Sequence, residues 1–527
     1  MNNTEQQQFQ QEVEKRRTFA IISHPDAGKT TLTEKLLLFG GAIRLAGTVK
    51  GRKAAKFATS DWMEIEKQRG ISVTSSVMQF DYAGKRINIL DTPGHQDFSE
   101  DTYRTLTAAD SAVMLIDSAK GVEAQTKKLF QVCRMRGIPI FTFINKLDRE
   151  GRDPFDLMEE LEEVLGIRSY PMNWPIGQGR GLKGVYDRRQ TRIELFQGDD
   201  HSTIAVQDVE GYEDPVVERV AGEHLFKQLK EELELLDVAG DAFDMDKVSR
   251  GELTPVFFGS AINNFGVQTF LDNFLKLAPA PTPRNSESGV IEPEEPKFSG
   301  YIFKIQANMN PAHRDRIAFL RIVSGKFQRG MSVKHVRVGK EIKLSQPQQF
   351  LAQDRDLVEE AYPGDIVGLF DPGIFRIGDT LAETGNIQFN ELPVFSPEIF
   401  AKVVVKNALK HKQYQKGIDQ LTEEGTIQVF RTIGFEDTIL GVVGQLQFEV
   451  FEYRMKHEYG VDVQLQRQPY QFARWVVGDN VDPGKFRVNS TLCRDKNDNY
   501  VALFESEYAM RTAVERNENL KFLETAP

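Results

Sequence analysis

Ser23-His24-Pro25-Asp26-Ala27-Gly28-Lys29-Thr30 is the stretch that decides the fold. It follows the apolar run 19–22 and precedes a helical pattern over 31–39, so a buried strand, a tight turn and a helix come in that order. Such a turn binds phosphate, because its N–H groups and the helix N-terminus attract anions, Lys29 reaches the β- and γ-phosphates, and the Thr30 hydroxyl ligates Mg²⁺. The usual pattern begins with Gly where Ser23 stands, so this stretch alone also fits an ordinary strand-to-helix turn.

The composition bounds the class of protein. The 527 residues are 40% hydrophobic and 27% charged, which predicts a globular chain of about three domains. A net charge of −11 argues against a generally basic protein that wraps nucleic acid. Only two cysteines occur, far apart, so no disulfide framework is expected. The polar N-terminal segment does not resemble a signal peptide, and no apolar run approaches the ~20 residues of a membrane span. We therefore expect a cytoplasmic protein with no membrane association.

Alternating strand and helix patterns predict an α/β P-loop domain over residues 1–284. Residues 171–250 interrupt the alternation and are predicted to be an insertion, with a hairpin over 184–196 and an acidic helical stretch over 214–236. Residues 40–70 form a long irregular stretch, for which a solvated basic loop and a contact site for an anionic partner both stay open. The expected elements are a hairpin (76–82 and 86–90), helices (97–108, 124–136, 154–165 and 267–277) and strands (112–117, 139–144 and 255–258).

Two further domains are predicted. A stiff Pro-rich segment, 278–283, leads into a polar linker over 285–297. Short strands separated by glycine turns predict an all-β barrel over 298–392. The order strand, helix, strand, strand, helix, strand predicts an α+β ferredoxin-like domain over 393–527, to which the tail adds a strand and a helix.

The segment Asp91-Thr92-Pro93-Gly94-His95 follows a predicted strand. Asp91 can hold an Mg²⁺-bound water, and the Gly94 N–H can approach a γ-phosphate, although a simple Pro-Gly turn has the same sequence. His95 can orient the attacking water, although loop histidines are more often merely exposed. Ser72 is the candidate second Mg²⁺ ligand, drawn in only when a γ-phosphate is present; a solvent-facing serine before a strand is the alternative.

The segment Asn145-Lys146-Leu147-Asp148 points to guanine. The Asp148 carboxylate can accept the guanine N1–H and exocyclic amine together, which adenine cannot satisfy. Asn145 can hold both the base and the phosphate loop, and the Lys146 stem can cover the base plane. Asp148 alone would also fit a helix N-cap. Gly259-Ser260-Ala261 follows the final strand, and its backbone N–H groups can donate to guanine O6.

The order of these motifs, each after a strand, predicts binding of GTP or GDP with Mg²⁺ at the carboxyl edge of a parallel sheet. His95 is the expected catalytic residue. Thr30 and Ser72 are the expected metal ligands, with Asp91 acting through water. The expected nucleotide-binding residues are Ser23, His24, Pro25, Asp26, Ala27, Gly28, Lys29, Thr30, Thr31, Asp91, Gly94, Asn145, Lys146, Asp148, Ser260 and Ala261.

The chain resembles the translational GTPases in 69–73, 91–95 and 145–148. It is similar to elongation factor G over nearly its whole length, including 325–327, 378–380 and 441–459, but elongation factor G has two further C-terminal domains. The shorter release-factor members of the family are more similar, over 16–30, 60–64, 303–309 and 359–365. Relative to the wider family, Ser23 replaces Gly or Ala, and Ser72 replaces Thr but keeps the hydroxyl.

The resemblance implies a ribosome-dependent GTPase of translation termination. It would promote dissociation of codon-reading release factors from the ribosome after peptide release, with ribosomal RNA positioning His95. The implied partners are the ribosome, through its RNA and proteins, and those release factors, and we expect a monomer. Two alternatives stay open: another elongation factor G-like ribosomal GTPase, and a GTP-gated ribosome-binding module with little turnover. A P-loop kinase is disfavoured because 145–148 serves guanine.

Overall fold

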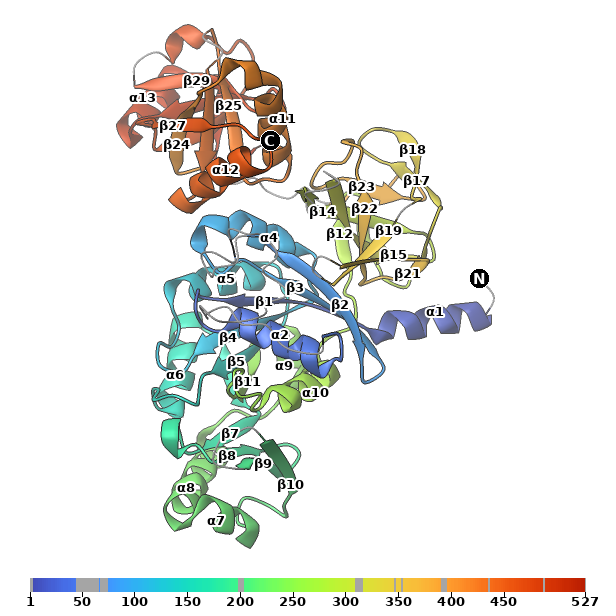
Figure 1. The fold of residues 1–527 in the computed structure, drawn as a ribbon, viewed down its shortest axis with the longest axis vertical. Coiled ribbons are helices and arrows are strands. Elements are labelled where there is room, and N and C mark those ends of the chain that lie inside the picture. Colours follow the sequence, from blue (N-terminus) through green and yellow to red (C-terminus); the bar gives the residue numbers. More distant parts are fainter. Residues whose placement is uncertain are drawn as a thin grey trace.

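The computed structural model describes residues 3–43, 66, 74–197, 203–308, 316–345, 347–351, 354–389, 396–434, 437–486 and 489–526. Figure 1 shows three units: an N-terminal α/β unit (3–277), a barrel unit (299–382) beside it, and a C-terminal unit (399–523) above. The predicted order of an α/β domain, a β-barrel and an α+β domain is confirmed.

A mostly parallel sheet forms the centre of the N-terminal unit. Its strand order is β2-β3-β1-β4-β5-β11-β6, and among these strands only β2 runs antiparallel to its neighbour. The predicted hairpin is β2 and β3, whereas β6 at the sheet edge was not predicted. The strands are β1 (Arg16–Ser23), β2 (Ser76–Tyr82), β3 (Lys85–Asp91), β4 (Ser111–Asp117), β5 (Ile140–Asn145), β6 (Arg168–Pro171) and β11 (Leu253–Phe258).

Helices cover both faces of this sheet (Figure 1). Phe19 and Ile21 of β1 pack on one face with α2 (Lys29–Phe39) and α10 (Val267–Leu277). Ala20 and Ile22 face the opposite core, which contains the apolar side chains of the helices α4 (Ser99–Thr107), α5 (Ala124–Met135) and α6 (Pro154–Leu165). Burial on both faces explains why β1 reads as a continuous apolar run.

The predicted insertion has its own small sheet, with the order β10-β9-β8-β7. The predicted hairpin is confirmed as β8 and β9. The expected single helical stretch over 214–236 is instead two helices, because Gly222, with a φ of 80°, interrupts the helical backbone between them. The elements are β7 (Asn173–Ile176), the 3₁₀ turn η2 (Gly179–Gly181), β8 (Gly184–Asp187), β9 (Arg192–Gln197), β10 (Thr203–Asp208), α7 (Pro215–Ala221), α8 (Glu223–Ala239) and α9 (Met245–Ser249).

The barrel unit is joined to the N-terminal unit by a short linker that itself contains the hairpin β12 (Arg284–Ser286) and β13 (Gly289–Ile291). Within the barrel unit, β19 also pairs with β2, so the sheets of the two units are continuous. The strands are β14 (Ser299–Ala307), β15 (Arg316–Ser324), β16 (Phe327–Gln328), β17 (Ser332–His335), β18 (Lys340–Lys343), β19 (Pro347–Leu351), β20 (Asp354–Leu357), β21 (Glu360–Ala361), β22 (Ile366–Phe370) and β23 (Thr380–Ala382).

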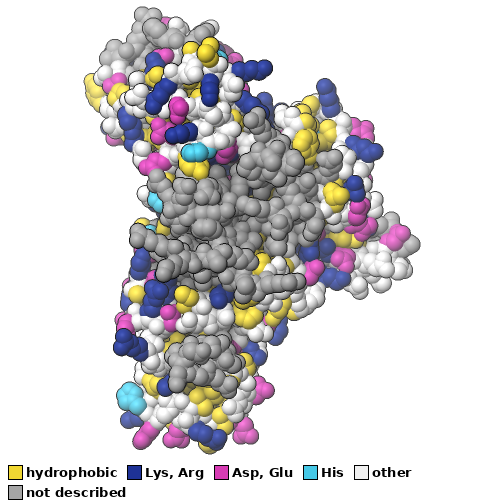
Figure 2. All heavy atoms as spheres, in the orientation of Figure 1, with side chains coloured by type: hydrophobic (Ala, Val, Ile, Leu, Met, Phe, Trp, Pro, Cys, Tyr) yellow, Lys and Arg dark blue, Asp and Glu magenta, His cyan; other side chains and the backbone are white. Residues whose placement is uncertain are grey.

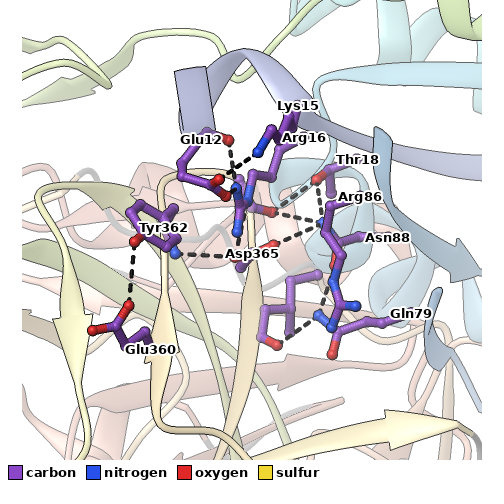
Figure 3. Close-up of polar contacts among 12 residues, drawn as sticks. Glu12, Lys15, Arg16, Thr18, Gln79, Arg86, Asn88, Glu360, Tyr362 and Asp365 are labelled. Atoms are coloured by element: carbon purple, nitrogen blue, oxygen red, sulfur yellow. Dashed lines mark hydrogen bonds and ion pairs between the residues drawn. The ribbon is translucent and has the colours of Figure 1, made fainter. Parts of the chain in front are cut away.

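Charged side chains fasten the barrel unit to the N-terminal unit. Figure 3 shows Arg16, the first residue of β1 directly after helix α1 (Asn3–Lys15), which contacts Asp365 of the barrel at 3.1 Å and lies over the Tyr362 ring. Deeper in the interface, Asp110 accepts from Arg321 of β15 at 2.6 Å. Burial raises the pKa of Asp110, but the positive charges of Arg321 and Arg284 outweigh it and hold the pKa below its usual range.

The C-terminal unit begins as predicted. Its first four strands have the order β27-β24-β26-β25, which is the ferredoxin-like arrangement, but the sheet then continues through β29-β30-β28-β31. The sequence predicted only β30 and α13 of this extension. The elements are β24 (Ile399–Val405), η3 (Ala408–Lys410), α11 (His411–Glu423), β25 (Gln428–Thr432), β26 (Thr438–Val442), α12 (Gln445–His457), β27 (Val463–Arg467), β28 (Phe472–Val477), η4 (Pro483–Lys485), β29 (Ser490–Arg494), β30 (Tyr500–Phe504), α13 (Glu507–Arg516) and β31 (Lys521–Leu523).

Figure 2 shows Lys and Arg side chains interspersed with Asp and Glu side chains on the visible parts of this face. Among the described residues, none of the helices combines the length and the apolar character that crossing a bilayer requires.

Candidate nucleotide site

The phosphate loop joins β1 to α2. Gly28 caps the N-terminus of α2 with a φ of 99° and offers no side chain, so the first-turn N–H groups are not capped by a side chain there. A Cβ at Gly28 would overlap the Asn145 amide. The Ser23 hydroxyl is buried and has no hydrogen-bond partner among the described residues. These features fit a phosphate-binding loop, since the uncapped N–H groups at the start of α2 can donate to an anion.

Lys29 and Asp91 meet beside this loop. The Lys29 ammonium contacts the Asp91 carboxylate, and both side chains are buried. Gly94 lies close to the Pro25 backbone, and Thr92 donates to the Ile21 carbonyl at 2.7 Å. The segment after β3 is thus held against the phosphate loop. The Lys29 ammonium suits a polyphosphate. The Asp91 carboxylate and the hydroxyl of Thr30, the residue after Lys29, are oxygen ligands that suit Mg²⁺.

Asn145 joins the phosphate loop to the 259–261 turn, at the part of the site where guanine is expected; this part is called the base end. Its Nδ2 donates to the Ala27 carbonyl at 2.9 Å, and its Oδ1 accepts from the Ala261 N–H at 2.9 Å. Asp148 accepts from the Ser260 hydroxyl at 2.5 Å. The structure therefore brings Asn145, Asp148 and the 260–261 turn to one place next to the phosphate loop.

Lys146 has a partner that the sequence interpretation missed. Its ammonium lies 2.6 Å from the carboxylate of Asp117, the last residue of β4, and 2.5 Å from the Asp26 carbonyl. Burial raises the pKa of Asp117, but hydrogen bonds from Lys146 and the Ala119 N–H outweigh it, so the pKa lies below its usual range. An aspartate at the carboxyl end of a buried strand was the available signal.

The 259–261 turn differs in detail from the expectation. The N–H groups of Gly259, Ser260 and Ala261 donate to the Ile144 carbonyl, the Phe265 carbonyl and Asn145 Oδ1, each at 2.9 Å. Donation from this turn to guanine O6 would therefore require one of these bonds to be shared or exchanged.

His95 lies at the other end of the site. It caps the 3₁₀ turn η1 (Gln96–Phe98), where its Nδ1 is 3.3 Å from the Asp97 N–H and 3.1 Å from the Asp97 carboxylate. Its side chain is 37% exposed, so the imidazole remains accessible. The expected helix over 97–108 begins with this tighter turn, and α4 follows it.

The helix α4 connects this end to the other units. Asp101 accepts from the Ser75 hydroxyl at 2.6 Å, and Lys304 of the barrel donates to the Ser75 carbonyl. Arg104 lies against the C-terminal unit, where it donates to the Glu424 carbonyl at 3.4 Å. Burial lowers the pKa of Lys304. Ser72, the expected second metal ligand, lies outside the described residues.

Three family models match successive parts of the chain. The Elongation factor Tu GTP binding domain matches residues 14–280, Elongation factor G domain 2 matches 297–384, and the Class II release factor RF3, C-terminal domain, matches 389–514. A P-loop sheet with this phosphate loop and guanine motif, followed by these domains, defines the class of the protein: it is a translational GTPase.

Curated relatives narrow the class. Peptide chain release factor 3 of Symbiobacterium thermophilum is 65% identical over 519 residues, with 98% of each chain covered. Peptide chain release factor 3 of Enterococcus faecalis is 59% identical, with 95% of this chain and 96% of that chain covered. Peptide chain release factor 3 of Listeria innocua is 57% identical, with 98% of this chain and 99% of that chain covered. The chain belongs to the peptide chain release factor 3 family, and is a ribosome-dependent GTPase of translation termination.

A solved structure supports the fold. A crystal structure of a protein from Thermus thermophilus superposes with a TM-score of 0.71 at 23% identity, covering 92% of this chain and 72% of that one.

Proposed function

We propose that this chain hydrolyses GTP on the ribosome and uses the resulting change in its units to promote dissociation of codon-reading release factors after peptide release. The observation that carries the proposal is the placement of the segment after Asp91. Asp97 contacts the C-terminal unit directly, and α4 contacts both the barrel and the C-terminal unit. A change at the γ-phosphate would therefore reach both units.

For nucleotide binding, the N–H groups of residues 23–31 and the Lys29 ammonium would hold the phosphates. Asn145, Lys146 and Asp148 would hold guanine, together with the 260–261 turn. Mg²⁺, when bound, neutralises charge on the phosphates. Thr30 and Ser72 would ligate it, and Asp91 would act through a water once Lys29 turns towards the phosphates.

For hydrolysis, His95 would order the attacking water in line with the γ-phosphate. Its partly exposed imidazole lies on the segment that begins at Asp91, so its position would depend on that segment. Ribosomal RNA would complete this arrangement, which would make turnover ribosome-dependent.

A change of nucleotide would be transmitted between domains. We propose that these domains span residues 1–284, 298–392 and 393–527, with the 171–250 insertion in the first and a linker over 285–297. The chain would act as a monomer in the cytoplasm. The buried pairs that cross between units, Arg321 with Asp110 and Lys304 with Ser75, would set how the domains rotate when the nucleotide changes.

The test is a ribosome assay with a fluorescently labelled codon-reading release factor on post-termination ribosomes. We expect this protein with GTP to speed departure of the factor, and protein with GDP alone to do so much less. Rapid GTP turnover without faster departure would point to another ribosomal GTPase. Faster departure without turnover would point to a GTP-gated binding module.

A further inference from the structure

Asp97 lies between His95 and the C-terminal unit. One carboxylate oxygen, Oδ1, is 3.1 Å from His95 Nδ1, and the other, Oδ2, accepts from the Leu446 N–H at 2.7 Å. The Asp97 side chain is only 8% exposed. A single buried carboxylate therefore joins the candidate catalytic histidine to the first turn of α12, a helix of the C-terminal unit.

The contact with His95 bears on the position of the imidazole proton. The Asp97 N–H donates to His95 Nδ1 at 3.3 Å, so this nitrogen accepts and the ring proton lies on Nε2. The Asp97 carboxylate oxygen Oδ1 lies 3.1 Å from the same nitrogen, so a displacement of the carboxylate would disturb the ring. The position of Asp97 therefore sets the orientation of the imidazole, and with it the direction in which Nε2 points.

The contact with α12 is shaped to hold that carboxylate. The helix is capped by Gly444, whose extended backbone would suit any residue, yet a Cβ there would overlap the Asp97 carboxyl group. The Gln447 side chain accepts from the Val443 and Gly444 N–H groups, whereas the Leu446 N–H goes to Asp97. Asp97 thus supplies, from another unit, the capping oxygen that Gly444 lacks, at the positive end of the helix dipole.

We propose that Asp97 is a positioning residue that sets the orientation of the His95 ring, and that the N-terminus of α12 holds Asp97. Docking of the C-terminal unit then sets the orientation of His95. The kinetic consequence rests on the proposed role of His95 in ordering the attacking water.

The first experiment uses the free full-length protein with ¹⁵N-labelled histidine. The chain has eight histidines, so the His95 signals can be assigned from His95→Ala. In Asp97→Asn the amide oxygen can keep the Leu446 bond, but the charge beside His95 Nδ1 is lost, so the His95 signals should shift. Gly444→Ala should also shift the His95 signals, by displacing the carboxylate. Unchanged His95 signals in both variants would overturn the proposal.

The second experiment measures ribosome-stimulated GTP hydrolysis. We expect Asp97→Asn and Gly444→Ala each to lower kcat about tenfold or more, with KM for ribosomes changed less than about threefold. The control is Gly211→Ala in the insertion, where a Cβ meets nothing within 4 Å and kcat should be unchanged. A loss confined to KM, or a lower thermal midpoint with normal kcat, would show a purely structural contact and overturn the proposal.

The double variant Asp97→Ala/Gly444→Ala isolates the contact. Because Asp97→Ala removes the atoms that a Cβ at Gly444 would overlap, Gly444→Ala should add less than about a twofold loss in that background. Fully additive losses would overturn the coupling.

His95→Ala separates this inference from the proposed function. Full GTP turnover in His95→Ala would disprove the proposed role of His95, and with it the expected loss of kcat in Asp97→Asn and Gly444→Ala. Lost turnover in His95→Ala beside normal kcat in both Asp97→Asn and Gly444→Ala would overturn the inference alone.

Discussion

At the base end of the nucleotide site, the hydrogen bonds described for Asn145, Lys146 and Asp148 all stay inside the N-terminal unit. At the hydrolysis end, the contacts cross between units: Asp97 reaches α12 and Arg104 reaches Glu424, both of the C-terminal unit. The proposed guanine contacts therefore do not depend on how the units are arranged, whereas the proposed hydrolysis end is built partly by the neighbouring units. Nucleotide affinity and GTP turnover should therefore be separable by mutation.

The largest effect should come from breaking the base end. Asp148→Asn should lower GTP affinity by about 10³-fold, because two guanine donors lose their acceptor, and should create a preference for xanthosine triphosphate. Competition against a fluorescent guanine nucleotide measures both. Glu159→Gln is the matched control, since Glu159 is an exposed carboxylate of α6 and its change should alter little. A variant that still prefers GTP would refute the assignment of Asp148.

A substitution at the hydrolysis end should lower GTP turnover and leave nucleotide affinity unchanged. His95→Ala should lower ribosome-stimulated kcat by about 10²-fold or more, while GDP affinity stays within about twofold, because the imidazole lies away from the base. Phosphate release at saturating ribosomes measures the first and nucleotide titration the second. His457→Ala, an exposed histidine of α12, serves as control. Full turnover in His95→Ala would disprove the role of His95.

The smallest effect on nucleotide affinity should come from the ion pair that holds Lys146 at the base end. Asp117→Asn should weaken GDP binding about tenfold, because Lys146 loses its charged partner. The folded-state pKa of Asp117 lies below its ordinary value of 3.8, so the stabilisation is present above pH 3.8 and is lost only as the pH falls through the lowered value. In the unaltered protein this pair should therefore make no change in affinity between about pH 6 and pH 8. A marked loss towards pH 6 in the unaltered protein but not in Asp117→Asn would contradict this.

Local patterns predicted most of the fold. The strands β1 to β5 and β11 and the helices α6 and α10 were expected within a few residues, because each has a clear apolar period and a distinct end signal. The extension β28, β29 and β31 was not predicted. The strands β28 and β31 pair with partners tens of residues away, and a local pattern contains no information on such pairing. The strand β29 forms a short hairpin with β30, which the sequence interpretation missed.

The site divides in the same way. By itself, the sequence determined which residue types stand at the carboxyl ends of β1, β3, β5 and β11, since the order of motifs along a parallel sheet forces them to one edge. Only the tertiary structure decided that Asp117 holds Lys146, and that Asp97 meets both His95 and the first turn of α12. Asp97 and Leu446 are 349 residues apart in the chain, and only the packing of separate units brings a carboxylate and a helix N-terminus within hydrogen-bond distance.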